Sequence, residues 1–205
     1  MHPGVMEKFL NVIGIEGSGF YMYLDTQANV VTVGLGFVLS NADEAVRFFR
    51  RYGGITDETR VRQAFRDVAA GGVVNWPMLS RQGMLNSARD RTNVIDGQLR
   101  APNCFGTAYD GWPADAQLAA LIMGYALGVG KLRTQWSDFM KACRDREWDK
   151  AFNESHWTSG VRRKREERQR ILRICFYNAL YSQRRGYRPM ILSYPAELQP
   201  TPENT

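Results

Sequence analysis

The stretch PADAQLAALIMGYALGVG, at residues 113–130, restricts the fold more than any other part of the sequence. Leu118, Leu121 and Ile122 recur at the spacing of one helix face, and alanines and a methionine cover much of the remaining surface. A helix that is apolar nearly all round has to be enclosed by other elements. The stretch therefore predicts a central, buried helix packed inside a larger helical region.

Further helices are predicted on both sides of this one. Residues 5–15 carry apolar side chains at helical spacing, and residues 40–54 and 56–72 each start with a capping residue and an acidic first turn and end in a glycine pair. Two amphipathic helices follow the central one, within residues 134–155 and 160–182. Between residues 71 and 112 the scattered Asn, Gly and Pro predict one or two short helices and a long loop.

The segments FYMYLD and NVVTVGLGF, between residues 20 and 37, are rich in β-branched and aromatic residues, and the polar TQAN between them predicts a hairpin turn. We therefore expect an α+β fold, in which a small lobe of helix and hairpin precedes a larger helical lobe, with a substrate cleft between them. The expected organisation is a single domain over residues 1–187, divided at residues 70 and 113, followed by a proline-rich, extended or loosely ordered tail over residues 188–205.

Two carboxyl groups flank the first strand of this hairpin. Glu16 follows the first helix, where the negative end of the helix dipole and partial desolvation are expected to raise the pKa of its side chain. Asp25 ends the strand beside the turn, where it is better hydrated and keeps its negative charge. One protonated and one ionised carboxyl group are the pair that glycoside hydrolysis uses. On spacing alone the alternative, two ordinary exposed acidic residues, is the stronger interpretation.

The context of these residues changes that balance. Glu16-Gly17, Tyr21 and Asp25-Thr26, followed by TVGLG at residues 32–36, resemble the active-site stretch of the phage-type lysozymes. The similarity continues in AALIMGYALG and in the segment from FMKACRDREWDKAF to the basic GVRRKREERQRIL. It covers roughly residues 6–40 and 113–180, and residues between them do not align.

The resemblance implies a lysozyme-like fold and a muramidase that cleaves the β-1,4 bond between N-acetylmuramic acid and N-acetylglucosamine in peptidoglycan, with no metal or other cofactor. It implies that Glu16 is the proton donor, that Asp25 is the base or electrostatic partner, and that Thr32 holds the attacking water. A separation wide enough for water predicts inversion at the anomeric carbon. The sequence departs from the family at Phe37, where a histidine is common, and in one extra residue between Asp25 and Thr32.

The surplus of 27 Lys and Arg over 21 Asp and Glu, a net charge of +6, favours an anionic partner. Tyr125 and Phe37 are candidates for stacking on sugar rings, and Arg163 is a candidate contact for acidic wall groups. The basic run VRRKREERQR is also explained by ion pairs within a solvated helix. It lacks the interleaved aromatic residues of a strand-binding surface, so nucleic acid is not the expected partner.

The three cysteines, Cys104, Cys143 and Cys175, show neither a disulfide framework nor zinc-ligand spacing, so buried free thiols are expected. With no signal peptide and no apolar run long enough to span a membrane, we expect the chain to be made in the cytoplasm and to act on the cell wall without stable membrane insertion. Phage-type release and injection into a rival bacterium remain open, with a secretion carrier or an immunity protein as a further partner. The alternative function is a non-catalytic lysozyme-like module that binds peptidoglycan or a partner.

Overall fold

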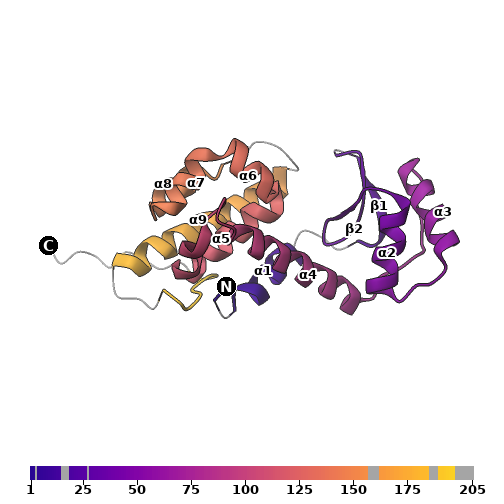
Figure 1. The fold of residues 1–205 in the computed structure, drawn as a ribbon, viewed down its shortest axis with the longest axis horizontal. Coiled ribbons are helices and arrows are strands. Elements are labelled where there is room, and N and C mark those ends of the chain that lie inside the picture. Colours follow the sequence, from indigo (N-terminus) through magenta and orange to yellow (C-terminus); the bar gives the residue numbers. More distant parts are fainter. Residues whose placement is uncertain (3, 15–18, 27, 157–161, 185–188, 197–205) are drawn as a thin grey trace. The chain divides into compact units, whose positions relative to one another are not determined.

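A computed structural model of the chain describes residues 1–2, 4–14, 19–26, 28–156, 162–184 and 189–196 (Figure 1). These residues combine helices with a three-stranded antiparallel sheet, which confirms the expected α+β class. The chain separates into two compact units. We call residues 10–91 the sheet unit, and residues 1–9 with 92–205 the helical unit.

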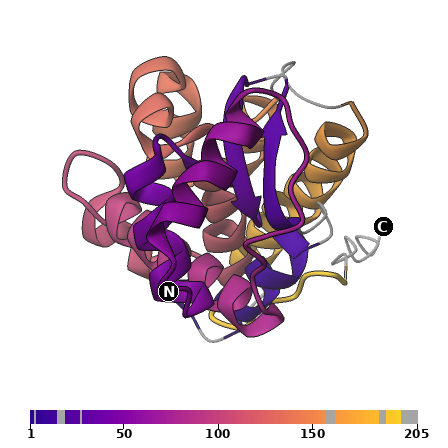
Figure 2. The same cartoon turned by 90° about the vertical axis from the view of Figure 1, so that its right-hand side faces the viewer.

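The sheet unit contains the predicted hairpin, which Figure 2 shows in ribbon form. The strands are β1 (Gly19–Asp25), β2 (Val30–Gly34) and β3 (Phe37–Leu39), paired in that order. The second predicted strand is divided because Gly34 and Gly36 take positive φ angles of 62° and 80°, which turn the chain between β2 and β3. The first predicted helix is present as α1 (Val5–Gly14), whose residues belong to both units.

Two helices of the sheet unit pack on the strands, α2 (Ala42–Gly53) and α3 (Glu58–Ala69). Both begin where the sequence predicts, because the side chains of Asn41 and Asp57 accept hydrogen bonds from backbone N–H groups of the first turn. Gly54 ends α2 with a φ of 65°, and its N–H donates to the carbonyl of Phe49. Local capping chemistry therefore fixes these helix ends.

The segment between residues 71 and 112 differs from the prediction of short helices and a long loop. It contains a 19-residue helix, α4 (Arg81–Leu99), and a short 3₁₀ helix, η1 (Gly106–Gly111). The buried positions of α4 do recur at helical spacing, but small or polar residues such as Ala88 and Thr92 occupy several of them. The apolar signal that reveals an amphipathic helix is weak for that reason.

The helical unit is built around α5 (Ala114–Leu127), which is buried along its length from Ala114 to Gly124 and confirms the predicted central helix. It packs against α9 (Arg162–Arg184) and α6 (Val129–Gln135). The region predicted as one further helix forms two, α7 (Ser137–Arg144) and α8 (Trp148–Asn153). Arg146 lies between them with a φ of 58°, a left-handed conformation that no helix interior accepts.

Candidate functional site

The β-sheet has one core face and one face that carries the candidate residues Asp25 and Thr32. Residues directly opposite in an antiparallel pair lie on the same face. Thr32 of β2 pairs with Tyr23 of β1 on one side and with Val38 of β3 on the other. Asp25 is two residues from Tyr23 in the same strand, so it shares this face as well. The opposite face holds buried residues such as Val31 and Leu39 and belongs to the core.

Asp25 ends β1 at the start of the turn. Its carboxylate oxygen Oδ1 accepts a hydrogen bond from the backbone N–H of Ala28 at 3.2 Å, the arrangement by which an aspartate closes a turn with its own side chain. Asn29 completes the turn with a φ of 53°, and asparagine is one of the few residues that tolerate this conformation. The side chain of Asp25 is half-buried, at the end of the sheet face that Thr32 shares.

Thr32 is buried on a face whose other members are open. Tyr23 and Val38, its neighbours on the two sides, are each 41% exposed, whereas Thr32 is 3% exposed. Its hydroxyl oxygen has no hydrogen-bond partner among the described residues. Leaving a buried hydroxyl without a partner costs about 1–3 kcal/mol, so such a group calls for an explanation. The oxygen has almost no surface open to solvent, so a water reaches it only if the atoms that cover it move.

Glu16, the proposed proton donor, lies in residues 15–18, outside the described residues. The structure describes the end of α1 at Gly14 and the start of β1 at Gly19, the elements that bracket it in the sequence. Its predicted place at the end of the first helix therefore stays a prediction.

The three candidate substrate contacts lie in different elements. Phe37 in β3 is half-buried, and its ring packs against Phe48 of α2 with centroids 4.7 Å apart. Tyr125 in α5 makes an edge-to-face contact with Phe9 at 5.4 Å in the helical unit. Arg163 lies in the first turn of α9, and the structure describes its backbone only. Their predicted contacts with substrate remain predictions.

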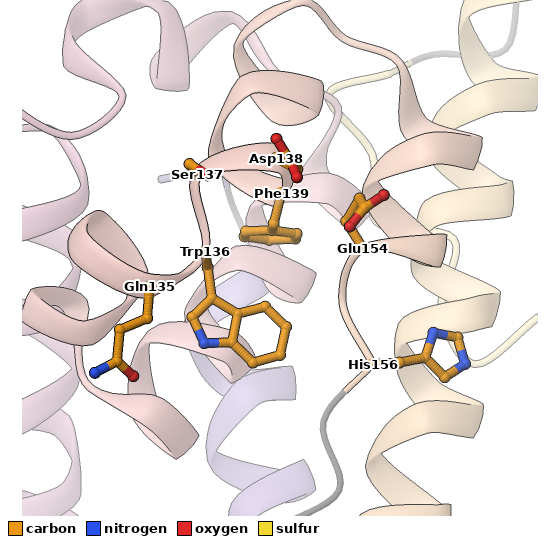
Figure 3. Close-up of a pocket in the computed structure, with 7 residues that line it drawn as sticks. All are labelled: Gln135, Trp136, Ser137, Asp138, Phe139, Glu154 and His156. Atoms are coloured by element: carbon orange, nitrogen blue, oxygen red, sulfur yellow. The ribbon is translucent and has the colours of Figure 1, made fainter.

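A pocket in the helical unit was not expected from the sequence (Figure 3). It has a volume of about 240 Å³ and lies where α6 meets α7 and the chain leaves α8. Its lining consists of Gln135, Trp136, Ser137, Asp138, Phe139, Glu154 and His156. In this view the carboxylates of Asp138 and Glu154 lie in the upper part, with the Trp136 indole below them on the left and the His156 ring on the right. An aromatic wall with several polar groups suits a polar ligand.

Asp115, in the first turn of α5, is a buried residue whose partners lie far away in the sequence. Its Oδ1 accepts hydrogen bonds from the side chain of Asn178 and the backbone N–H of Tyr194, both at 2.9 Å, and its Oδ2 accepts from the N–H of Ser193 at 2.8 Å. Burial raises the pKa of this carboxyl group, against the opposing effect of these hydrogen bonds.

These bonds attach the described part of the C-terminal segment, residues 189–196, to the helical unit, where the sequence predicts an extended or loosely ordered tail. The N–H of Ala114 also donates to the carbonyl of Pro189 at 2.7 Å. An acidic residue in a first helical turn is ordinarily explained by the helix dipole, so the sequence contains no signal that distinguishes this anchor.

The cysteines are free and buried, as predicted. Burial raises the pKa of Cys104 and raises those of Cys143 and Cys175 well above the usual range, so these thiols stay protonated. Within the described ranges, no three His, Cys, Asp or Glu side chains gather in a way that would hold a metal ion. No helix in the described part of the chain is long and apolar enough to cross a membrane.

Comparison of the sequence with protein-family models and with curated proteins gave no match. The functional assignment therefore depends on the residues and geometry described above.

Proposed function

We propose that this protein is a peptidoglycan hydrolase with a lysozyme-like fold, which cleaves the β-1,4 bond between N-acetylmuramic acid and N-acetylglucosamine. In this proposal Glu16 protonates the bridging oxygen, and Asp25 activates a water or stabilises the developing positive charge. Thr32 hydrogen-bonds the attacking water, and the reaction inverts the anomeric carbon. The protein would be made in the cytoplasm and act on the cell wall.

The buried hydroxyl of Thr32 is the observation that most supports this proposal. It shares a sheet face with Asp25, and it has no hydrogen-bond partner among the described residues. A threonine that served packing alone would gain from being a valine, since the valine has nearly the same shape and no polar atom to desolvate. If the atoms that cover the hydroxyl move when substrate binds, a water beside Asp25 would satisfy it and would stand where a nucleophile is needed.

The test is digestion of purified peptidoglycan, with the fragments analysed by mass, by reducing ends and by the anomeric configuration of the first product. General acid or base catalysis contributes about 100- to 10,000-fold, so Glu16→Gln and Asp25→Asn are each expected to lower the rate by at least about 100-fold. Asp67→Asn is the matched control, because Asp67 is another acidic residue of the sheet unit and its side chain bonds only to Gln63 among the contacts described.

Thr32→Val separates a catalytic from a structural role. Because the hydroxyl has no described partner, the variant is expected to unfold at the same or a higher denaturant concentration than the wild type, while cleavage slows. A loss of stability with unchanged activity would instead assign Thr32 to the fold. Products that end in an anhydro sugar would show that the cleavage is lytic and not hydrolytic. If the folded wild type releases no soluble fragments, the proposed enzymatic activity is refuted.

A second function is favoured by the pocket at Trp136. If the chain is a non-catalytic binder of wall glycan or of a partner, this pocket offers an aromatic ring with carboxylate and amide groups around it. Pull-down with insoluble peptidoglycan would then retain the wild type and Glu16→Gln equally, and neither would release fragments. Trp136→Ala would be released at least several-fold more easily. Under the hydrolase proposal the wild type instead cleaves the glycan, and Glu16→Gln does not.

A further inference from the structure

Two arginines from different helices converge on one turn of the helical unit. Arg144, in the last turn of α7, donates from Nε and from Nη2 to the carbonyl of Cys104, at 3.1 and 2.9 Å. Arg133, in the last turn of α6, lies beside the preceding residue, Asn103. With the amide oxygen of Asn103 turned toward it, this guanidinium donates from Nη1 and Nη2 at 3.2 and 3.1 Å. Two positive charges are thus held at adjacent residues of the chain.

Neither guanidinium is in an ion pair within the described residues, although the charge of Arg144 also acts on the neighbouring Asp145. Arg133 and Arg144 are both exposed and, within the described residues, neither has a carboxylate at ion-pair distance. Other arginines are paired, as Arg51 is with Asp90 and Arg100 is with Asp96.

The acidic residues that follow Arg144 in the sequence already have partners. Asp145 pairs with Lys141, and Glu147 pairs with Lys150. The charges of Arg133 and Arg144 both act on the Cys104 thiol, where they oppose the effect of burial on its pKa. A negative group bound at this turn would offset them.

The contacts at the turn also orient the two side chains. A guanidinium has five N–H donors in a planar fork, and each of these arginines uses two of them on the turn. The remaining donors are available to a ligand, and the loss of side-chain freedom on binding is reduced because the fork is already held. An oxyanion is the group that such forks recognise with paired hydrogen bonds.

We propose that Arg133 and Arg144 form a binding site for a phosphate monoester group. The charge of the site decides whether a dianion or a singly charged oxyanion fits better. Two guanidinium groups match the charge of a dianion, whereas a single carboxylate would neutralise only half of it. A phosphate monoester carries nearly two negative charges above its second pKa of about 6. The site belongs to the helical unit and does not depend on the hydrolase proposal.

The probe is glycerol 3-phosphate, titrated at about pH 8 into the full chain, with acetate at equal ionic strength as the singly charged comparison. The readout is the side-chain Nε–Hε NMR signals of the arginines. We expect saturable shifts at Arg133 and Arg144, with acetate binding at least tenfold more weakly. Lowering the pH to about 5, where the phosphate loses one charge, is expected to weaken the binding several-fold.

Arg133→Gln/Arg144→Gln is expected to weaken the binding at least tenfold. Arg81→Gln/Arg89→Gln removes the same charge from exposed arginines of α4 and is expected to leave the binding unchanged. Arg133→Gln alone keeps the Arg144 contact to the backbone, so it tests the site even if the double variant unfolds, and it should weaken binding several-fold. Equal loss in the α4 variant, equal affinity for acetate, or shifts spread over all arginines would overturn the proposal.

Discussion

Replacing Gly83 with alanine tests a close backbone contact between α4 and α2 in the sheet unit. Gly83 lies in the first turn of α4, where a Cβ atom would stand 2.1 Å from the carbonyl oxygen of Tyr52 and 3.1 Å from its carbonyl carbon. Tyr52 belongs to the last turn of α2, and backbone at a helix end cannot rotate out of the way as a side chain can. Contacts of a Cβ atom below 3.0 Å are essentially never observed, so the two backbones must separate by at least 0.9 Å, the difference from 2.1 Å.

The fall in the free energy of unfolding follows from overpacking at this contact between α2 and α4. Overpacking a well-packed contact typically costs about 1–3 kcal/mol, and the higher helix propensity of alanine returns at most about 1 kcal/mol. Because the clash is with backbone, we expect the upper part of this range and a net loss of about 2 kcal/mol in the free energy of unfolding. The N–H of Gly83 also donates to the Ser80 hydroxyl at 3.0 Å, and this N-terminal cap would be displaced with it.

Urea denaturation followed by circular dichroism measures this loss, and amide hydrogen exchange locates it. A loss of about 2 kcal/mol corresponds to a fall in melting temperature of roughly 4–8 °C for a chain of this size. Gly97→Ala is the matched control, since Gly97 lies in the same helix and a Cβ atom added there would meet no atom within 4 Å. It is expected to raise stability by about 0.5–1 kcal/mol. Equal stability of Gly83→Ala and wild type, with unchanged exchange in α2, would refute the reasoning.

Three further predictions concern capping and the buried carboxyl group. Asp115→Asn replaces one acceptor oxygen by an NH₂ group that faces N–H donors, so we expect the free energy of unfolding to fall by about 1–3 kcal/mol. Proteolysis after residue 189 should be faster, and resistance to the protease equal to that of the wild type would contradict this. The pKa of Asp115 is raised above 3.8 in the folded state. Between pH 3.8 and the folded pKa, the folded state therefore binds more protons than the unfolded state, and the free energy of unfolding falls as the pH rises through this window. The difference in unfolding free energy between wild type and Asp115→Asn should therefore narrow from about pH 3.5 to neutral in urea titrations, and a widening difference would reverse the sign of the argument. Asn41→Ala removes the hydrogen bond that Asn41 accepts from the N–H of Glu44 and should lower the free energy of unfolding by about 1 kcal/mol in urea denaturation. Gln82→Ala, at an exposed position of α4, is the control and should cost at most about 0.5 kcal/mol, because it loses only a surface hydrogen bond to Asn86.

Several features of the fold could be predicted from the sequence because short-range chemistry determines them. Asn41 and Asp57 cap helices with their own side chains, so the start of each helix is visible in a few residues. The apolar surface of residues 114–124 requires burial wherever the helix is placed. The β-branched residues of NVVTVGLGF predict a strand, and Val30–Gly34 form β2.

The candidate site is predicted in the same local way only in part. The sequence places Asp25 beside a turn, and the structure adds its hydrogen bond to Ala28. The burial of Thr32 depends on neighbours in other strands, Tyr23 and Val38, whose pairing no local pattern specifies. That the hydroxyl lacks a partner among the described residues is therefore visible only in the assembled sheet.

Tertiary structure alone decided the remaining features, because each depends on residues far apart in the chain. Asp115 resembles an ordinary first-turn acid until Ser193 and Tyr194, 78 and 79 residues later, donate to it. The length of α4 is set by packing that accepts Ala88 and Gly83 as buried positions, since close helix contacts favour small residues. The sequence determines the ends of helices such as α2 and α3 through their capping residues, and it shows that α5 must be buried. Which side chains meet depends on long-range packing, whose partners no local spacing encodes.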